Sequence, residues 1–570
     1  MPVSDRTVTH RYTLVEIDHL LSLLDETSEP SASSQKGPFT IFAARGNPQK
    51  HMSSHNSETL SPRHDGNSRD GSPQPDTVYG STDDQGVQTT AIERNTALAR
   101  QKDDTGCQFR LPSSSHYFDF EEQIANSTSD CHSYPKVTET LDEDFCSLQT
   151  PDSIPTHLKE DEDDFLMQYY VSNLADVLQP VNHPSSPYRG VYAPFALQGV
   201  SLDSCQSLYE PRPEKAVHHA ILASAAFHLW NGDHVHRRFA KTAARHRWCA
   251  IRSLQATIAL RSIQYRAVMM AVLTSITMGV VAGDDDNFLV HIQGIMQLRN
   301  TRKNWRMISE STRQLNDISS LLALLARTLA FEPASQLACI DPAEDDYSRK
   351  SPNMIYERRE ASCYAYIYGV TPQTVDAIRR TCRLAETIES LEKGSAIPSD
   401  VLESCETLGD DLLSWDLTSN HLDLFLGDRE DAAIFEHHAK AWHHAALTYY
   451  YRRIQGLSYP DLVHDVRLVA THMQAVETLK AASSNPAKKA MAPIPWPMFI
   501  ASCEALGEER YTFEEWWKSI QRYGIANNKR LWDAVQIIWR TRDQNQTERN
   551  EETTSWIDMY RDLGIRLLPV

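Results

Sequence analysis

Histidine is the residue type with the most evident capacity for chemistry in this sequence. The chain contains 23 histidines, including the adjacent pairs His218-His219, His437-His438 and His443-His444. Imidazole transfers protons near neutral pH and is a common zinc ligand. Two ligands on one helix face must be three or four residues apart, whereas the last two pairs are five to seven residues apart. We therefore expect these histidines to be structural or exposed, and we predict no metal ligands.

Cysteine spacing also argues against a metal centre. The ten cysteines are never closer together than fifteen residues, while structural zinc sites use pairs two to four residues apart. An acidic run, Asp284-Asp285-Asp286-Asn287, resembles the start of a calcium loop. It lacks the glycine at the sixth position and the bidentate glutamate at the twelfth. We expect this run to cap the helix that follows it.

Motifs of the common enzyme classes are missing from the sequence. It contains no glycine-rich phosphate loop, no nucleophile elbow and no His-Glu-x-x-His pair. We therefore predict that the chain is not an enzyme. We assign no catalytic residue and no cofactor-binding residue.

The most basic stretch, residues 237–266, contains eight Lys and Arg residues without one Asp or Glu. Such a stretch could contact phosphate. Its arginines fall on several sides of a helix, however, and Arg is well suited to ion pairs inside a helical bundle. We favour the structural interpretation and assign no DNA-binding residue. Two shorter basic segments, 299–306 and 488–489, are weak candidates for a nuclear localisation signal.

The negative charge of the chain is concentrated in its N-terminal third. Residues 1–165 contain 13 basic and 29 acidic residues, which accounts for most of the net charge of −20. Non-specific nucleic-acid binding depends on neutralising phosphates with Lys and Arg, so any DNA contact must be local. No secretion signal is evident, and we expect the thiols to be reduced inside the cell.

The first 164 residues contain little that could form a core. Residues 11–25 carry a helical apolar stripe and precede an extended Gly-Pro-Phe segment at 37–39, so we treat 1–45 as one unit. Residues 46–106 contain only seven large apolar residues in 61 positions, too few to offset the entropy lost on ordering. We predict that 46–164 is disordered and acidic.

Two interpretations of the acidic part remain open. At 117–146, aromatic residues such as Phe118, Phe120 and Phe145 are scattered among carboxylates, a composition typical of activation segments that fold on a partner. A solvated linker is equally consistent with this composition. For the run at 160–164 we favour a linker that ends in the acidic first turn of a helix beginning near Phe165.

Helical periodicity continues from 165 almost to the C-terminus. The predicted helices cover 165–178, 216–230, 237–262, 267–283, 287–299, 319–331, 375–391, 431–455, 463–482, 496–506, 513–520 and 528–540. We find no strand alternation and no repeat, and we predict a large all-α unit over 165–570. The stretch 267–283 is uncharged but only 17 residues long, so we favour a buried core helix over a membrane span.

Several blocks of this region resemble the fungal-specific transcription factor domain, in the branch that includes regulators of arginine metabolism. The blocks are Ser186-Pro187-Tyr188-Arg189, Ala193-Pro194-Phe195-Ala196, the Ala-rich segment 219–230, the segment 273–294, the Tyr-Arg-Arg segment 449–454 and the segment 495–505, followed by Arg510 and Trp539. The resemblance covers about residues 165–542 and implies a helical regulatory domain.

Members of this family usually carry an N-terminal cluster of six cysteines that binds two zinc ions and reads DNA. Here the first cysteine is Cys107, so the zinc ligands of that cluster are absent and we predict no cofactor. The Gly-Pro-Phe segment resembles the one that commonly follows the zinc cluster in relatives. We therefore expect either that the module was lost or that the start codon is assigned too late.

The leading hypothesis is a nuclear regulator of fungal metabolism, in a secondary-metabolite or amino-acid pathway. DNA binding would come from a missing N-terminus or a partner, and the expected partners are the transcription machinery or a co-regulator. A small-molecule effector and a homodimer are compatible with this hypothesis, and no membrane is expected. The alternatives are an α-helical small-molecule-binding protein or enzyme, and a membrane-associated protein that uses 267–283.

Overall fold

The computed structural model describes residues 156–201, 212–232, 237–259, 264–283, 288–301, 309–331, 363–392, 395–425, 427–549 and 555–570. Every regular element within these ranges is a helix, which confirms the predicted all-α class. The predicted helix at 11–25, the Gly-Pro-Phe segment and residues 46–155 of the predicted disordered region lie outside them.

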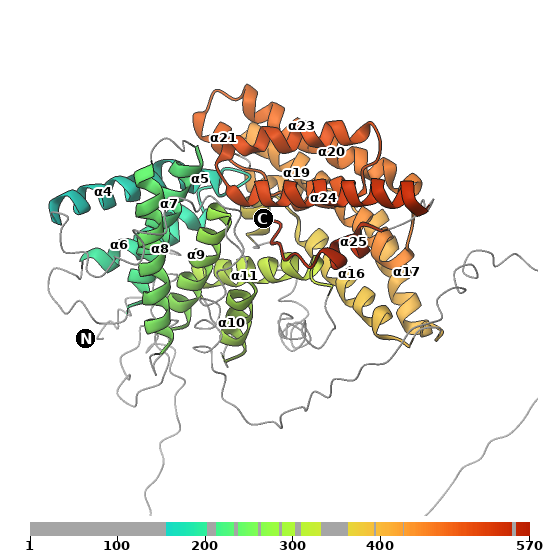
Figure 1. Cartoon of the computed structure of the whole chain (residues 1–570), viewed down its shortest axis with the longest axis horizontal. Coiled ribbons are helices and arrows are strands. Elements are labelled where there is room, and N and C mark those ends of the chain that lie inside the picture. Colours follow the sequence, from blue (N-terminus) through green and yellow to red (C-terminus); the bar gives the residue numbers. More distant parts are fainter. Residues whose placement is uncertain are drawn as a thin grey trace, which may run out of the picture. The chain divides into compact units, whose positions relative to one another are not determined.

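The helices of the first half gather at one end of the described bundle, except that α11 (Glu310–Thr328) runs from there toward α16 (Pro372–Ser390), which it contacts (Figure 1). The helices of the first half are α4 (Thr156–Tyr169), α5 (Ala175–Val177), α6 (Ala193–Ser201), α7 (Pro213–Gly232), α8 (Arg237–Ile258), α9 (Tyr265–Ala282), α10 (Phe288–Thr301) and α11. Small residues on α7, such as Ala220, Ala223 and Ala226, are fully buried. They let α8 and α9 pack closely against α7.

The acidic run at 160–164 lies inside a helix rather than before one. Helix α4 begins at Thr156, so the predicted start near Phe165 is too late and the run does not form a first turn. Glu162 and Asp163 contact α8, where Glu162 accepts a hydrogen bond from Thr242 at 3.3 Å. Contacts with α8 therefore account for helix in a segment whose composition suggested a linker.

Helix α9 contains the apolar stretch that raised the question of a membrane span. Among the described helices it is long and apolar enough to cross a bilayer, and 78 % of its residues are buried inside the protein. It packs against α7, α8, α10, α11 and α24 (Ala526–Arg549). The preferred interpretation as a core helix agrees with this placement.

The second half of the chain supplies the other end of the bundle (Figure 1). Its helices are α15 (Tyr364–Tyr368), α16 (Pro372–Ser390), α17 (Ser399–Leu413), α18 (Ser419–Leu422), α19 (Arg429–Tyr450), α20 (Tyr459–Ala482), α21 (Pro486–Ala490), α22 (Trp496–Glu504), α23 (Glu509–Ile520), α24 and α25 (Trp556–Leu563). Helices α19, α20 and α22 pack on one another, and Trp442 of α19 stacks on Trp496 of α22 with ring centroids 4.9 Å apart.

Six helices of the described ranges were not predicted, namely α6, α15, α17, α18, α21 and α25. Helix α17 buries only Cys405, Leu408 and Leu412, so its apolar stripe is thin. A close contact with α19 helps to position it. The hydroxyl of Tyr450 donates a hydrogen bond to the Cys405 carbonyl at 2.8 Å, and a Cβ at Gly409 would lie 2.9 Å from that hydroxyl. Gly409 weakens the helical pattern of the sequence, and its missing side chain leaves the space that the Tyr450 hydroxyl occupies.

Candidate functional site

Glu504, the last residue of α22, is the centre of a buried junction between four helices. Its side chain is 1 % exposed. Arg452, in the π-helical turn that extends α19 (Tyr451–Gln455), binds both carboxylate oxygens at 2.6 and 2.5 Å. The indole of Trp556 in α25 donates to Oε1 at 2.9 Å. A bidentate arginine and an indole thus satisfy a carboxylate that would otherwise be costly to bury.

Side chains of α24 donate hydrogen bonds to the backbone carbonyls at the end of α22. Arg542 of α24 donates to the carbonyls of Cys503 at 2.7 Å and Glu504 at 3.1 Å. The Trp539 indole donates to the Ser502 carbonyl at 2.7 Å. These groups donate to the last carbonyls of the helix, of which that of Ser502 also accepts from the Ala505 amide at 3.2 Å. The segments 449–454 and 495–505, which carried much of the family resemblance, therefore meet at one structural centre.

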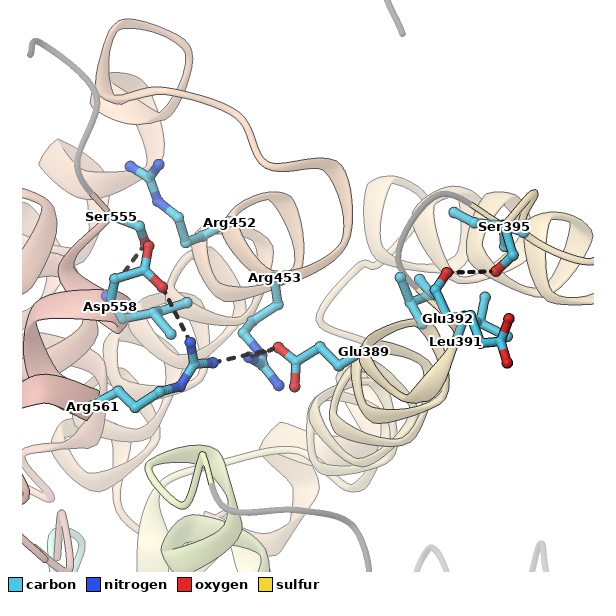
Figure 2. A pocket seen from close by; sticks show the side chains of 12 residues that line it. Glu389, Leu391, Glu392, Ser395, Arg452, Arg453, Ser555, Asp558 and Arg561 are labelled. Atoms are coloured by element: carbon cyan, nitrogen blue, oxygen red, sulfur yellow. Dashed lines mark hydrogen bonds and ion pairs between the residues drawn. The ribbon is translucent and has the colours of Figure 1, made fainter. Parts of the chain in front are cut away.

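A cleft of about 640 Å³ opens beside this junction, between the end of α16, the π-helical turn after α19 and the start of α25 (Figure 2). Arg453 is its most buried cation, with 5 % of its side chain exposed, and it pairs with Glu389 at 2.7 Å. Arg561 pairs with Asp558 at 3.2 Å and lies 3.8 Å from Glu389. Both guanidinium groups lie over the ring of Phe331, at 5.1 and 5.6 Å from its centroid.

The cleft offers charged groups rather than a catalytic arrangement. Three arginines and the carboxylates of Glu389, Glu392 and Asp558 line it in equal numbers. The Ser395 hydroxyl donates to the Glu392 carbonyl at 2.8 Å, and Ser555 caps α25 by accepting from the Ile557 amide. Within the described residues, neither hydroxyl makes a hydrogen bond to a side chain that could act as a base. The side chains can hold a charged ligand by ion pairing.

A smaller, mostly apolar cavity of about 260 Å³ lies next to the cleft and shares Arg561 with it. Phe288, Leu289, Leu329 and Phe331 contribute to its lining. Arg561 and Arg566 are the charged residues of its lining, so the smaller cavity combines apolar side chains with two guanidinium groups.

The structure brings several of the predicted histidines together in pairs. His437 and His472 approach with their Nδ1 atoms 3.0 Å apart, and His444 contacts Asp465 at 2.8 Å. His219 and His246 approach at 3.1 Å. In the part of the chain that the structure describes, no group of three or more His, Cys, Asp or Glu side chains could hold a metal ion.

Burial lowers the pKa of most histidines on α19. His443 stacks on Trp415 with the ring centroids 4.2 Å apart, and burial lowers the pKa of His443 to about 4. His438 is completely buried, and burial lowers its pKa well below the usual value. His438 and His443 are therefore neutral, packed side chains near pH 7.

Other candidates from the sequence are placed as follows. The acidic run 284–287 lies outside the described residues, so its predicted capping role stays a prediction. Cys363, Cys382 and Cys503 are buried thiols, and burial raises their pKa values. Such thiols are poor nucleophiles and metal ligands.

The weak candidates for a localisation signal have structural roles where they are described. Lys488 is 2 % exposed and contacts Asp428, Glu430 and Asp431, the last two at 3.2 and 3.4 Å. Arg299 is 8 % exposed and donates to Ser319 at 3.1 Å. Residues 302–308 lie outside the described ranges.

The basic stretch 237–266 is divided between structural and exposed residues. Arg245 pairs with Asp163 of α4 at 3.4 Å, as the structural interpretation expected. Arg238, Lys241 and Arg252 are exposed and make no ion pair within the described residues. Trp248 lies between them with 58 % of its surface exposed, and the Arg252 guanidinium lies 5.0 Å above its ring. Sequence reasoning missed this exposed tryptophan, although its spacing from Lys241 and Arg252 places it on their helix face.

The comparisons with known proteins agree on one family. A model of the "Fungal specific transcription factor domain" matches residues 165–570. Arginine metabolism regulation protein II of Saccharomyces cerevisiae is 25 % identical over 136 residues, which are 23 % of this chain and 14 % of that protein. No solved structure matches. Because the family model covers more than half of the chain, this chain belongs to the fungal-specific transcription factor domain family.

Proposed function

We propose that this chain is a nuclear regulator of metabolic genes whose helical domain controls an acidic N-terminal region. The family match over 165–570 is the observation that carries this proposal. Ahead of the matched region lies the acidic part of the chain, with 29 acidic and 13 basic residues in 1–165. The partial similarity to a regulator of arginine metabolism supports a metabolic role. The proposed regulator has no catalytic activity.

The zinc cluster that the family implies does not fit the residues present here. The first cysteine is Cys107, and within the described ranges no cluster of His, Cys, Asp or Glu could hold a metal ion. We therefore propose that DNA is contacted through a partner or through sequence that precedes Met1. The transcription machinery or a co-regulator would bind the acidic region.

The cleft beside Arg453 is the proposed site for a small-molecule effector. Its paired arginines and carboxylates suit a charged ligand, and the adjacent apolar cavity suits an uncharged part of the same molecule. Such a ligand shifts a regulatory equilibrium only if it binds the two states with different affinity.

A tethering experiment tests the proposed function. The full chain is fused to a heterologous DNA-binding domain, and reporter transcription is compared with that domain alone. We expect activation that decreases when residues 117–146 are deleted. A fluorescent fusion measures whether the chain accumulates in the nucleus. A tethered full chain that leaves reporter transcription unchanged, neither raised nor lowered, would contradict the proposal.

A further inference from the structure

The exposed face of α8 combines cations with a large aromatic side chain. We define the α8 face as Arg238, Lys241, Trp248 and Arg252. All four are exposed, and they follow one side of a 22-residue helix. An indole that is 58 % exposed beside unpaired cations is an unusual surface feature, because large aromatic groups are enriched where proteins bind partners.

The acidic part of the same chain already reaches this helix. Asp163 of α4 contacts Arg245 at 3.4 Å and His246 at 3.1 Å, and Glu162 accepts a hydrogen bond from Thr242. Phe165 stacks on Phe239 with ring centroids 6.4 Å apart. The part of α4 around Asp163 therefore lies beside the N-terminal half of α8, and the polypeptide that precedes α4 joins the helix at Thr156, about 10 Å from Asp163 along the helix axis.

Residues 117–146 have the composition that matches the α8 face. They contain eight Asp and Glu residues and one Lys, together with aromatic residues such as Phe118, Phe120 and Phe145. Carboxylates complement the three cations, and an aromatic side chain can pack against Trp248. Between 146 and the start of α4 at Thr156 the chain can span about 35 Å, and the α8 face from Arg238 to Arg252 is about 21 Å long. The segment can therefore reach the whole α8 face.

We propose that residues 117–146 dock on the α8 face of the same chain, with their carboxylates opposite Arg238, Lys241 and Arg252. The tether keeps this segment at an effective concentration of the order of mM, which favours it over an acidic segment of another protein. The docking is argued from the opposite charges of the segment and the α8 face, from the length of the chain that links them and from the contacts of α4 with α8. Its regulatory meaning, that docking masks an activation segment, rests on the proposed function.

Carbodiimide cross-linking of the full chain tests the docking, because this reagent joins a carboxylate to a lysine in direct contact. Lys241 is the only lysine in 237–266. We expect dilute monomeric chain to give peptides that join Lys241 to carboxylates at 119–144, and we expect their yield to decrease in high salt, where ion pairs at the surface are screened. The link between Lys488 and Asp428 is the internal positive control.

Charge reversal on α8 provides the decisive comparison. The variant R238E/R252E keeps Lys241 and is expected to reduce these links at least about fivefold, as the loss of two surface ion pairs would. The matched variant K529E/R540E, on the exposed surface of α24, is expected to leave them unchanged. The reciprocal variant E121K/E122K changes two carboxylates of the segment and should also reduce them. Combining it with R238E/R252E should restore contact between the segment and α8.

The outcomes separate docking from its regulatory role. If Lys241 is not linked to 117–146 while the Lys488 control is recovered, the docking proposal is overturned. It is also overturned if the chain retains duplex DNA through Arg238 and Arg252 and gives no such links, because the α8 face is then a nucleic-acid contact. If the links form but the tethered R238E/R252E chain, from which the segment is released, also leaves the reporter unchanged, docking stands and the activation role fails.

Discussion

The Glu504 junction and the α8 face are built from the same residue types, yet they are opposite environments. At the junction, Arg452 and Trp556 are directed at one buried carboxylate and both make hydrogen bonds to it. On the α8 face, Arg252 and Trp248 contact each other and otherwise face solvent. An arginine beside a tryptophan therefore has different roles in these two regions of the protein. Burial and the presence of a carboxylate decide whether the pair stabilises the fold or remains available for binding.

We expect the largest change in the free energy of unfolding when the carboxylate of Glu504 is removed. We expect Glu504→Ala to lower the free energy of unfolding by about 3–5 kcal/mol, because Arg452 is left buried without a counter-charge. Urea unfolding followed by circular dichroism measures the change. Glu403→Ala, at an exposed position of α17, is the control and should stay within about 0.5 kcal/mol. Equal effects of the two substitutions would contradict the role of the junction.

A smaller effect is expected from a buried histidine. Burial lowers the pKa of His443 to about 4, whereas the pKa in the unfolded chain is about 6.5. The folded state therefore binds fewer protons, so this contribution to stability is present above pH 6.5 and is lost as the pH falls toward 4. His443→Phe should reduce the stability lost between pH 7.5 and 5 by about 1–2 kcal/mol. His444 and Asp465 are the titratable neighbours of His443, and both are left unchanged in this variant.

The pH experiment compares urea midpoints at the two pH values. His464→Phe, at an exposed position of α20, is the matched variant, and it should leave the pH dependence close to that of the unmodified chain. If His443→Phe gives the same pH dependence as the unmodified chain, the assignment of a neutral buried imidazole is wrong.

The smallest effect is expected on the α8 face. Trp248→Ala should change the free energy of unfolding by no more than about 0.5 kcal/mol, since the side chain is mostly in solvent. A double-mutant cycle with Arg252→Ala should give a coupling of about 0.5–1 kcal/mol from the cation–π contact. A loss of several kcal/mol on removing Trp248 would show that this face is part of the core and not a surface for binding.

Residue patterns predicted most of the described helices and their class. Long periodic or apolar stretches, such as those of α7, α9 and α19, can be recognised from the sequence because the whole helical pattern lies within one short window. The patterns failed where a helix depends on distant partners. The start of α4 depends on contacts between Asp163 and α8, and α17 depends on the fit of Tyr450 at Gly409.

The candidate site was less predictable than the fold. The segments around Arg452 and Glu504 were identified by family resemblance, but nothing in their spacing shows that the two side chains meet across 52 residues. The cleft beside Arg453 was not anticipated, because its walls come from α16, α19 and α25 and one of these helices was not predicted. The zinc and calcium arguments needed only local spacing, so they were accessible from the sequence.

Arg561 lines both the cleft and the smaller cavity. Its side chain is 46 % exposed. Exposed ion pairs of this kind contribute only about 0–1 kcal/mol, a range comparable with thermal energy. Rotation of this one side chain therefore changes the shape of both cavities at little energetic cost. The room for a bound molecule depends on the conformation of Arg561, and the two volumes of about 640 and 260 Å³ belong to the conformation in which it pairs with Asp558.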